Sequence, residues 1–366
     1  MDSDEDMHHI DTDLPSLSSL DKGKGKAVLH DESEDKSARR DDTLPWVEKY
    51  RPVTLDDVVS HKDITGTIER FIEKNRLPHL LFYGPPGTGK TSTIIAVARR
   101  IYGPTFRKQI LELNASDDRG IDVVREQIKQ FAETRTLFAK GFKLIILDEA
   151  DMMTTAAQAA LRRVIEQYTK NVRFCIICNY VNKITPAIQS RCTRFRFSPL
   201  PIVEVQKRLN HVVEAESVNL TDDGKAALLK LSKGDMRRAL NVLQACHAAY
   251  ERIGETEIYT CTGSPHPSDI EAIINSMLSE EFTASHQKIN ALKIDRGLAL
   301  QDLLSGAYEY VDTIEFPPAA RVYLLDQLAT TEYRLSAGAD EKIQLTALLG
   351  AFKNTVELTA KAKSKE

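Results

Sequence analysis

Long apolar runs, tryptophan and cysteine are all scarce in this sequence. Its 366 residues include one Trp and five Cys, and aromatic residues make up 7% of the chain. No apolar run approaches the roughly 18 residues that cross a bilayer, and the N-terminus opens with acidic residues instead of a basic and then apolar signal segment. An odd number of scattered cysteines favours reduced thiols over a disulfide framework. We therefore expect a soluble, unsecreted protein without a membrane partner.

Residues 1–42 lack Phe, Trp and Tyr altogether. They contain 13 Asp and Glu against six Lys and Arg. A segment with so little apolar surface cannot offset the entropy that ordering would cost, so we predict a disordered acidic tail. Because the whole chain has a formal net charge of −4, the remaining residues are mildly basic. That charge permits nucleic-acid binding without proving it.

Residues 43–200 alternate strand-like and helix-like segments. The strand-like runs occupy residues 79–83, 109–113, 143–147, 173–178 and 193–197. Segments with helical periodicity lie between them at 89–102, 120–134 and 154–168. Strands that alternate with helices imply right-handed crossovers and a parallel sheet covered on both faces. We predict an α/β domain.

The β signal disappears after residue 200. Three short amphipathic helices are predicted at 202–217, 221–232 and 235–250, the second with Thr221 as its N-cap. They would form a small helical domain over 201–253. Glycine and proline residues make 254–267 a predicted linker. Residues 268–366 are predicted to be helical, with a break at Pro317-Pro318 and a turn around Gly338.

Residues 84–91 form a phosphate-binding loop motif. The sequence Gly84-Pro85-Pro86-Gly87-Thr88-Gly89-Lys90-Thr91 fits G-x-x-x-x-G-K-[ST] between a strand and a helix. Glycines let backbone N–H groups surround phosphates, and the helix N-terminus adds its dipole. Lys90 is expected to bind the β and γ phosphates of ATP, and the Thr91 hydroxyl to bind Mg²⁺. An incidental glycine turn is the alternative, which the context disfavours.

Polar residues follow the next two apolar strands. Asp148 and Glu149 end the run 144–147, and Asn179 follows the run 173–178. A strand beside the phosphate loop would place Asp148 on the metal and Glu149 as a base for the attacking water. Asn179 would lie at the same sheet edge and orient that water. Without the phosphate loop, these would be ordinary turn residues.

Cys175 and Cys178 form a C-x-x-C pair inside an apolar run. Such a pair can bind a metal or perform redox chemistry, but the sequence offers no second pair with suitable spacing. We therefore interpret both as buried strand cysteines.

Two arginines are placed where they could reach a nucleotide. Arg191 ends a predicted short helix in Ser190-Arg191-Cys192, at the rim of the α/β domain. A rim arginine is usually a solvated charge, but it could enter a neighbouring subunit's site in trans as an arginine finger. Arg237 lies near the start of the third helix of the small helical domain and could sense nucleotide there.

Six segments together resemble the sequence boxes of the replication factor C small subunits. They are 44–52, the phosphate loop, 113–120, 148–151, 190–192 and 234–237. The resemblance is close from residue 44 to about 250 and looser beyond. This family belongs to the AAA+ ATPases and loads a sliding clamp onto primed DNA as a five-subunit arc. Within it, the chain most resembles the subunits numbered 3 or 5, depending on the naming scheme. The intact phosphate loop tells against the one small subunit whose loop departs from the ATPase pattern.

The resemblance implies a fold and several nucleotide contacts. The fold would be an AAA+ parallel-sheet P-loop domain, followed by a small helical lid and an all-α collar that serves oligomerisation. Val47, Tyr50 and Arg51 match the segment that lines the adenine pocket. Arg191 matches the trans finger, and Arg237 the lid arginine.

The resemblance also implies two docking elements. Arg119, Gly120, Ile121 and Arg125 match an element that tracks the DNA backbone. Ile101, Tyr102 and Phe106 follow the phosphate-loop helix, where family members dock on the clamp. Ordinary surface charge for the two arginines, and simple packing for the three apolar side chains, remain open alternatives.

The function implied is that of an ATPase subunit of the heteropentameric clamp loader. It would use ATP and Mg²⁺ to open the sliding clamp PCNA and load it onto primer-template DNA in the nucleus, during replication and repair. Its partners would be one large and three small subunits, together with alternative clamp-loader large subunits.

The sequence leaves two alternative functions to consider. One is a structural ring subunit that binds ATP without hydrolysing it, which the presence of Glu149 and Asn179 disfavours. The other is a DEAD-box helicase, suggested by residues 148–151. Helicases of that class need a second RecA-like domain, whereas 201–366 is predicted to be helical.

Overall fold

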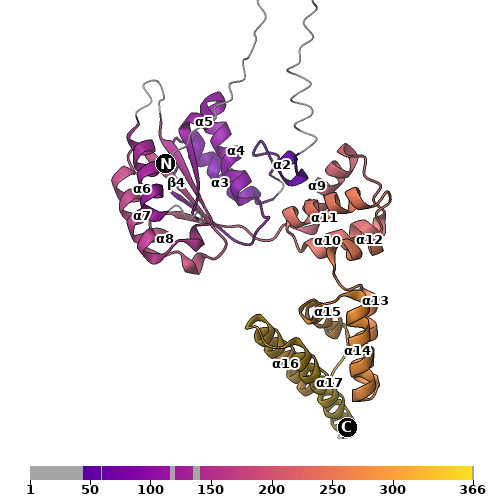
Figure 1. The fold of residues 1–366 in the computed structure, drawn as a ribbon. Coiled ribbons are helices and arrows are strands. Elements are labelled where there is room, and N and C mark those ends of the chain that lie inside the picture. The colour runs from indigo at the N-terminus through magenta and orange to yellow at the C-terminus, as the bar shows by residue number, and fades with distance from the viewer. Residues whose placement is uncertain (1–43, 59, 116–119, 135–140, 365–366) are drawn as a thin grey trace, which may run out of the picture. The chain divides into compact units, whose positions relative to one another are not determined.

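The computed structural model describes residues 44–58, 60–115, 120–134 and 141–364. The described residues from Pro45 onwards belong to one compact unit. The predicted acidic tail, residues 1–42, lies outside the described residues. Figure 1 draws the described residues in colour.

Five parallel strands form a sheet in the order β2-β3-β4-β1-β5. Their bounds are β1 Leu80–Tyr83, β2 Ile110–Asn114, β3 Lys143–Asp148, β4 Val172–Cys178 and β5 Thr193–Arg196. Each predicted strand is present, and the predicted parallel α/β architecture is confirmed. Because β1 lies next to β4, its carboxyl end opens beside that of β4 and one strand away from that of β3.

The two faces of the sheet bury different side chains of the same strands. Leu80 and Phe82 of β1 pack with one apolar cluster, whereas Leu81 packs with another. Side chains alternate along a strand, so both faces must be apolar, and this explains the nearly continuous apolar runs in the sequence. The same alternation sends Cys175 and Cys178 to opposite clusters. Both are buried free thiols, as predicted.

Helices cover both faces of this sheet (Figure 1). One face carries α3 Lys62–Glu73 and α4 Lys90–Tyr102, and the other carries α6 Gly120–Glu133, α7 Thr155–Tyr168 and α8 Pro186–Gln189. Shorter helical elements are α2 Trp46–Lys49, η1 Gly103–Thr105, α5 Phe106–Gln109, η2 Ala150–Met152 and η3 Val181–Lys183. We refer to the sheet and its covering helices as the sheet domain.

Four helices with their own apolar core follow the sheet domain, and we call them the lid. They are α9 Ile202–Ala215, α10 Asp222–Ser232, α11 Met236–Ala249 and α12 Glu255–Thr262. Thr221 caps α10 by accepting a hydrogen bond from the Gly224 N–H, as predicted. The fourth helix corrects the prediction of a linker over 254–267. Its Ile258 and Tyr259 are buried in the lid core, and this burial stabilises the helix. The glycines and prolines that led to the prediction of a linker lie on either side of it.

Five further helices, which we call the collar, share a separate apolar core. They are α13 Pro267–Ser279, α14 Phe282–Arg296, α15 Leu300–Thr313, α16 Pro318–Ser336 and α17 Glu341–Lys363. The predicted breaks at Pro317-Pro318 and Gly338 separate α15 from α16 and α16 from α17. In the described part of the chain, every helix is too short or too polar to cross a membrane.

Candidate nucleotide site

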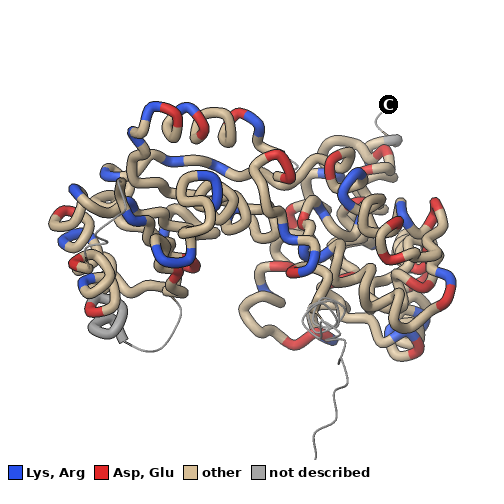
Figure 2. Tube along the Cα trace, turned by 90° about the horizontal axis from the view of Figure 1, so that it is seen from above, with Lys and Arg blue, Asp and Glu red and all other residues tan. Residues whose placement is uncertain are grey.

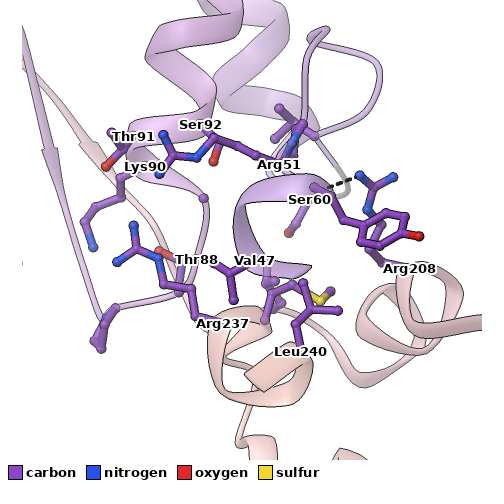
Figure 3. A pocket seen from close by; sticks show the side chains of 18 of the residues that line it. Val47, Arg51, Ser60, Thr88, Lys90, Thr91, Ser92, Arg208, Arg237 and Leu240 are labelled. Carbon is purple, nitrogen blue, oxygen red and sulfur yellow. Dashed lines mark hydrogen bonds between the residues drawn. The ribbon is translucent and has the colours of Figure 1, made fainter. Parts of the chain in front are cut away.

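A cavity of about 220 Å³ opens at the carboxyl edge of the sheet and is closed by residues of α2 and the lid. Figure 3 shows Lys90, Thr91 and Thr88 at one end, Arg208 at the other, and Val47 with Leu240 between them. Most of the predicted nucleotide residues line this cavity: Val47, Tyr50, Arg51, Pro86, Gly87, Thr88, Gly89, Lys90, Thr91, Asp148, Glu149, Asn179 and Arg237. Residues that the sequence places up to 190 positions apart therefore meet in one site.

The Lys90 ammonium lies among oxygen atoms. It donates hydrogen bonds to the carbonyl oxygens of Gly84 and Pro85, each at 2.8 Å, and to Asn179 Oδ1 at 3.1 Å. Burial lowers the pKa of Lys90, and the positive charge of Arg237 lowers it further, while the Asp148 carboxylate opposes both effects. Two cationic groups at one end of a cavity, one of them buried, favour an anionic ligand there.

Two glycines of the loop occupy positions that no side chain could fill. A Cβ on Gly84, whose φ is 142°, would lie 2.0 Å from the Phe197 carbonyl oxygen. A Cβ on Gly87, whose φ is 67°, would lie 1.6 Å from an Asp235 carboxylate oxygen. The lack of a side chain at these two positions therefore lets the loop lie close to the residue after β5 and to the lid.

The predicted metal ligands lie side by side. The Thr91 hydroxyl donates a hydrogen bond to Asp148 Oδ2 at 2.7 Å. Thr91 is the second residue of α4 and Asp148 ends β3, so the sheet edge brings the two oxygens together. A hydroxyl and a carboxylate at this spacing suit Mg²⁺, which prefers a few protein oxygens and otherwise keeps water and phosphate ligands.

Glu149 has an exposed side chain and an unusual backbone. Its φ is 53°, in the left-handed region that residues other than glycine rarely adopt, and its N–H donates to Asp148 Oδ1 at 2.9 Å. Such a conformation costs on the order of 1 kcal/mol and is concentrated at functional sites. Glu149 lines the cavity and is free to meet a water molecule there.

A buried carboxylate that the sequence analysis did not single out supports Asn179. Asp151 Oδ2 accepts hydrogen bonds from the N–H groups of Asn179 and Tyr180, both at 3.3 Å, and Asp151 is 8% exposed. Asp151 therefore fixes the chain directly after β4. The position of Asp151 in the sequence is a signal for this role, because an acid three residues after Asp148 can lie near the same edge of the sheet.

The other end of the cavity is built by α2 and the lid. Val47 and Tyr50 come from α2 and the residue after it, and Met236 and Leu240 come from α11. Apolar and aromatic groups of this kind suit the flat surface of a purine base. Arg208 of α9 donates to the Tyr50 carbonyl oxygen at 2.8 Å. Apart from Arg237, the lid residues of this cavity could not be predicted from the sequence, because they lie over 110 positions beyond the phosphate loop.

Asp235 connects the lid to the phosphate loop. Its carboxylate caps α11 by accepting from the N–H groups of Arg237 and Arg238 at 2.8 and 3.2 Å. The neighbouring Met236 N–H donates to the Gly87 carbonyl oxygen at 3.3 Å. The cap therefore orients the first turn of α11, which carries Arg237 to the phosphate end of the cavity (Figure 3).

Arg191 lies apart from the residues that line this cavity. Its guanidinium donates to the Ala187 carbonyl oxygen at 2.6 Å and pairs with Glu166 of α7. Its side chain is 34% exposed. The structure therefore separates Arg191 from the other predicted catalytic residues within the described chain.

The predicted docking residues are only partly described. Arg119 lies outside the described residues, while Gly120, Ile121 and Arg125 belong to α6. The clamp candidates follow or end α4. Ile101 and Tyr102 pack against the sheet core, and the Tyr102 hydroxyl donates to the Phe142 carbonyl oxygen at 2.7 Å. Phe106 lies between Arg99 and Arg107, whose guanidinium carbons are 5.4 and 5.9 Å from its ring centre.

Comparisons with known proteins agree with this geometry. Residues 80–200 match the family described as ATPase family associated with various cellular activities (AAA), and residues 265–351 match the replication factor C C-terminal domain. Replication factor C subunit 3 of Schizosaccharomyces pombe is 61% identical over 94% of this chain and 99% of its own length. Subunit 5 of Homo sapiens is 56% identical over 89% and 96%. Subunit 3 of Saccharomyces cerevisiae is 53% identical over 87% and 96%.

The parallel sheet, the phosphate loop and the acidic strand end define an ATPase of the AAA class. With relatives this similar over nearly the whole chain, the protein belongs to the replication factor C family, among the subunits numbered 3 or 5. It is an ATPase subunit of a multi-subunit clamp loader. Neither the helicase nor the non-hydrolysing ring subunit is favoured.

Proposed function

We propose that the chain binds Mg²⁺-ATP in this cavity and hydrolyses it with help from a neighbouring subunit. The meeting of Lys90, Thr91 and Asp148 at one sheet edge carries the proposal. Lys90 and Arg237 would bind the β and γ phosphates, and the loop N–H groups would surround them. Val47, Tyr50 and Arg51 would hold the base.

In hydrolysis, each side chain would have a separate task. Thr91 and Asp148 would hold Mg²⁺, which neutralises the charge that develops on the phosphates. Glu149 would accept a proton from the attacking water, and Asn179 would orient that water. Arg191 would serve the next subunit's site, because it is placed away from this chain's own cavity.

Nucleotide titration of the assembled complex tests the site. Lys90→Ala should weaken ATP binding at least tenfold, because a buried cation facing the phosphates is lost. Lys207→Ala is the matched control, because Lys207 is an exposed lid lysine that pairs with Glu204 at 3.2 Å. Equal ATP affinity for Lys90→Ala and the unsubstituted chain would rule out the proposed phosphate contact.

We further propose the assembly that the resemblance implies. The chain would join one large and three small subunits in the nucleus, or alternative large subunits, and load PCNA onto primer-template DNA for replication and repair. Support comes from the family membership and from Arg191, which would contact a nucleotide only when a neighbouring subunit docks. Co-purification of four relatives and a clamp from native extract tests this composition.

DNA and clamp contacts complete the proposal. Arg119, Gly120, Ile121 and Arg125 would follow the DNA backbone, and Ile101, Tyr102 and Phe106 would dock on the clamp. Basic and acidic residues are interleaved along the described chain (Figure 2), so charge alone does not select the DNA face. Arg119→Ala should weaken the binding of primer-template DNA about equally for all DNA sequences. It should also reduce the dependence of DNA affinity on salt concentration, given as the slope of a log–log plot, by roughly one unit.

A further inference from the structure

We propose that Glu216, the C-cap residue directly after α9, is a positioning residue for the base end of the nucleotide and acts through Tyr50. This inference rests on the proposed function, since it assigns a role within the same cavity. Among the described residues, Tyr50 lines the cavity whereas Glu216 is not one of the residues that line it. Glu216 would therefore affect the ligand without touching it.

The contact between the two residues is short and specific. The Tyr50 hydroxyl donates to Glu216 Oε1 at 2.5 Å, and the Lys49 ammonium lies 2.8 Å from the same oxygen. The Glu216 side chain is 17% exposed, so water competes little for it. The aromatic ring of Tyr50 is thereby fixed at its far end, which limits the angle at which it can face a base.

The protonation states suit this contact. Burial, followed by the hydrogen bond to Glu216, raises the pKa of Tyr50 to about 12, so its hydroxyl keeps the proton that it donates. Burial alone would raise the pKa of Glu216, but hydrogen bonds from Lys49 and Tyr50 outweigh it and lower that pKa. The pair is a charge-assisted hydrogen bond at neutral pH, which is stronger than a neutral one.

Other contacts keep α2 on the lid when this one is removed. The Trp46 N–H donates to Gln244 Oε1 at 3.0 Å, and the Trp46 ring lies 5.5 Å from that of His247. Arg208 holds the Tyr50 carbonyl oxygen. Loss of the Glu216 carboxylate should therefore release the Tyr50 side chain without undocking α2.

The test compares ATP with inorganic tripolyphosphate, which has no base, as ligands of the full-length chain. Glu216→Ala should weaken ATP binding about tenfold and tripolyphosphate binding by less than about twofold, because the lesion is at the base end. Glu216→Gln should recover most of the ATP affinity, since its amide oxygen still accepts from Tyr50. Tyr50→Phe should match Glu216→Ala, and combining the two should add little further loss.

Glu204→Ala is the matched control on the same helix. Glu204 also pairs with a lysine, Lys207, but this pair lies within α9 and does not involve Tyr50, so ATP affinity should stay unchanged. Equal losses for ATP and tripolyphosphate in Glu216→Ala, or unchanged ATP affinity, would overturn the inference. Lys90→Ala distinguishes a failure of the inference about Glu216 from a failure of the proposed nucleotide site, because it should weaken the binding of both ATP and tripolyphosphate. If it weakens neither, the nucleotide site itself is wrong.

Discussion

The two ends of the cavity are constructed in different ways. The phosphate end consists largely of one continuous loop, 84–91, with the ends of β3 and β4 beside it. The base end consists of α2, α9 and α11, which come from opposite sides of the sheet domain in the sequence. A loop can be recognised from spacing, whereas a wall made of three distant segments exists only when the lid docks.

The phosphate end is therefore suited to hydrolysis, and the base end to linking nucleotide binding to the position of the lid. The phosphate end has rigid support from buried strands, which suits groups that must keep their geometry during hydrolysis. The base end joins α2 to the lid through Trp46, Tyr50 and Glu216. A nucleotide that bridges both ends would link the sheet domain to the lid, so that binding would favour one arrangement of the two.

Removal of the Arg191 side chain should have the largest effect of the changes considered. If Arg191 acts at the nucleotide site of its own chain, the proposed division between residues that serve this site and those that serve a neighbour is wrong. Arg191→Ala should reduce hydrolysis at the neighbouring subunit's site on the order of 10³-fold, because that site loses its finger. ATP binding by this chain should be intact. Mixed complexes with one competent site each provide the measurement. If the complex that relies on this chain's own site is the inactive one, Arg191 acts in cis.

Glu149→Gln should have the next largest effect. The amide cannot accept a proton from water, so single-turnover hydrolysis at this chain's site should fall on the order of 10²-fold. ATP affinity should change little, because Lys90 and Thr91 remain. A parallel loss of affinity would show that Glu149 binds nucleotide instead of activating water.

Acidification should destabilise the sheet domain through His79. Its Nδ1 accepts from the Phe174 N–H at 3.1 Å and its Nε2 lies 3.3 Å from Thr169 Oγ1, which requires a neutral ring. Burial, aided by the charge of Arg173, lowers the pKa of His79 to about 4. The unfolded chain therefore binds the extra proton first, and stability falls as pH drops from about 6.5 to about 4.

The size of this effect should be about 3 kcal/mol in the free energy of unfolding. Urea unfolding at a series of pH values measures it. His79→Gln, which cannot titrate, should lose the corresponding part of the pH dependence. An unchanged profile for that variant would mean that other groups cause the acid sensitivity.

The smallest effect concerns helix caps in the two regions. Thr221 caps α10 in the lid, and Thr154 caps α7 in the sheet domain by accepting from the Ala157 N–H at 3.3 Å. Thr221→Ala and Thr154→Ala should each lower the free energy of unfolding by about 1 kcal/mol. Chemical denaturation of both variants provides the comparison. A much larger loss for Thr221→Ala would point to the second hydrogen bond of this hydroxyl, which it donates to the Ile253 carbonyl oxygen at 3.2 Å.

Local sequence signals explain what could be predicted. The apolar runs that form β1, β3 and β4 are buried on both faces of the sheet. Nearly all of their residues are therefore apolar, and the runs can be recognised in the sequence. The phosphate loop was recognisable because its glycines, lysine and threonine are adjacent in the chain. By contrast, α12 was missed because its stability comes from Ile258 and Tyr259 packing in the lid core, which no local pattern reports.

The α/β class, the phosphate loop and the acidic strand end could be predicted from the amino-acid order alone, because these features depend on residues that are neighbours or share a strand edge. Tertiary structure decided that Asp151 supports Asn179, that Asp235 meets Gly87, and that Glu216 holds Tyr50. Those contacts join segments 28 to 166 positions apart. Their formation depends on helices docking through apolar burial, which acts without regard to distance along the chain.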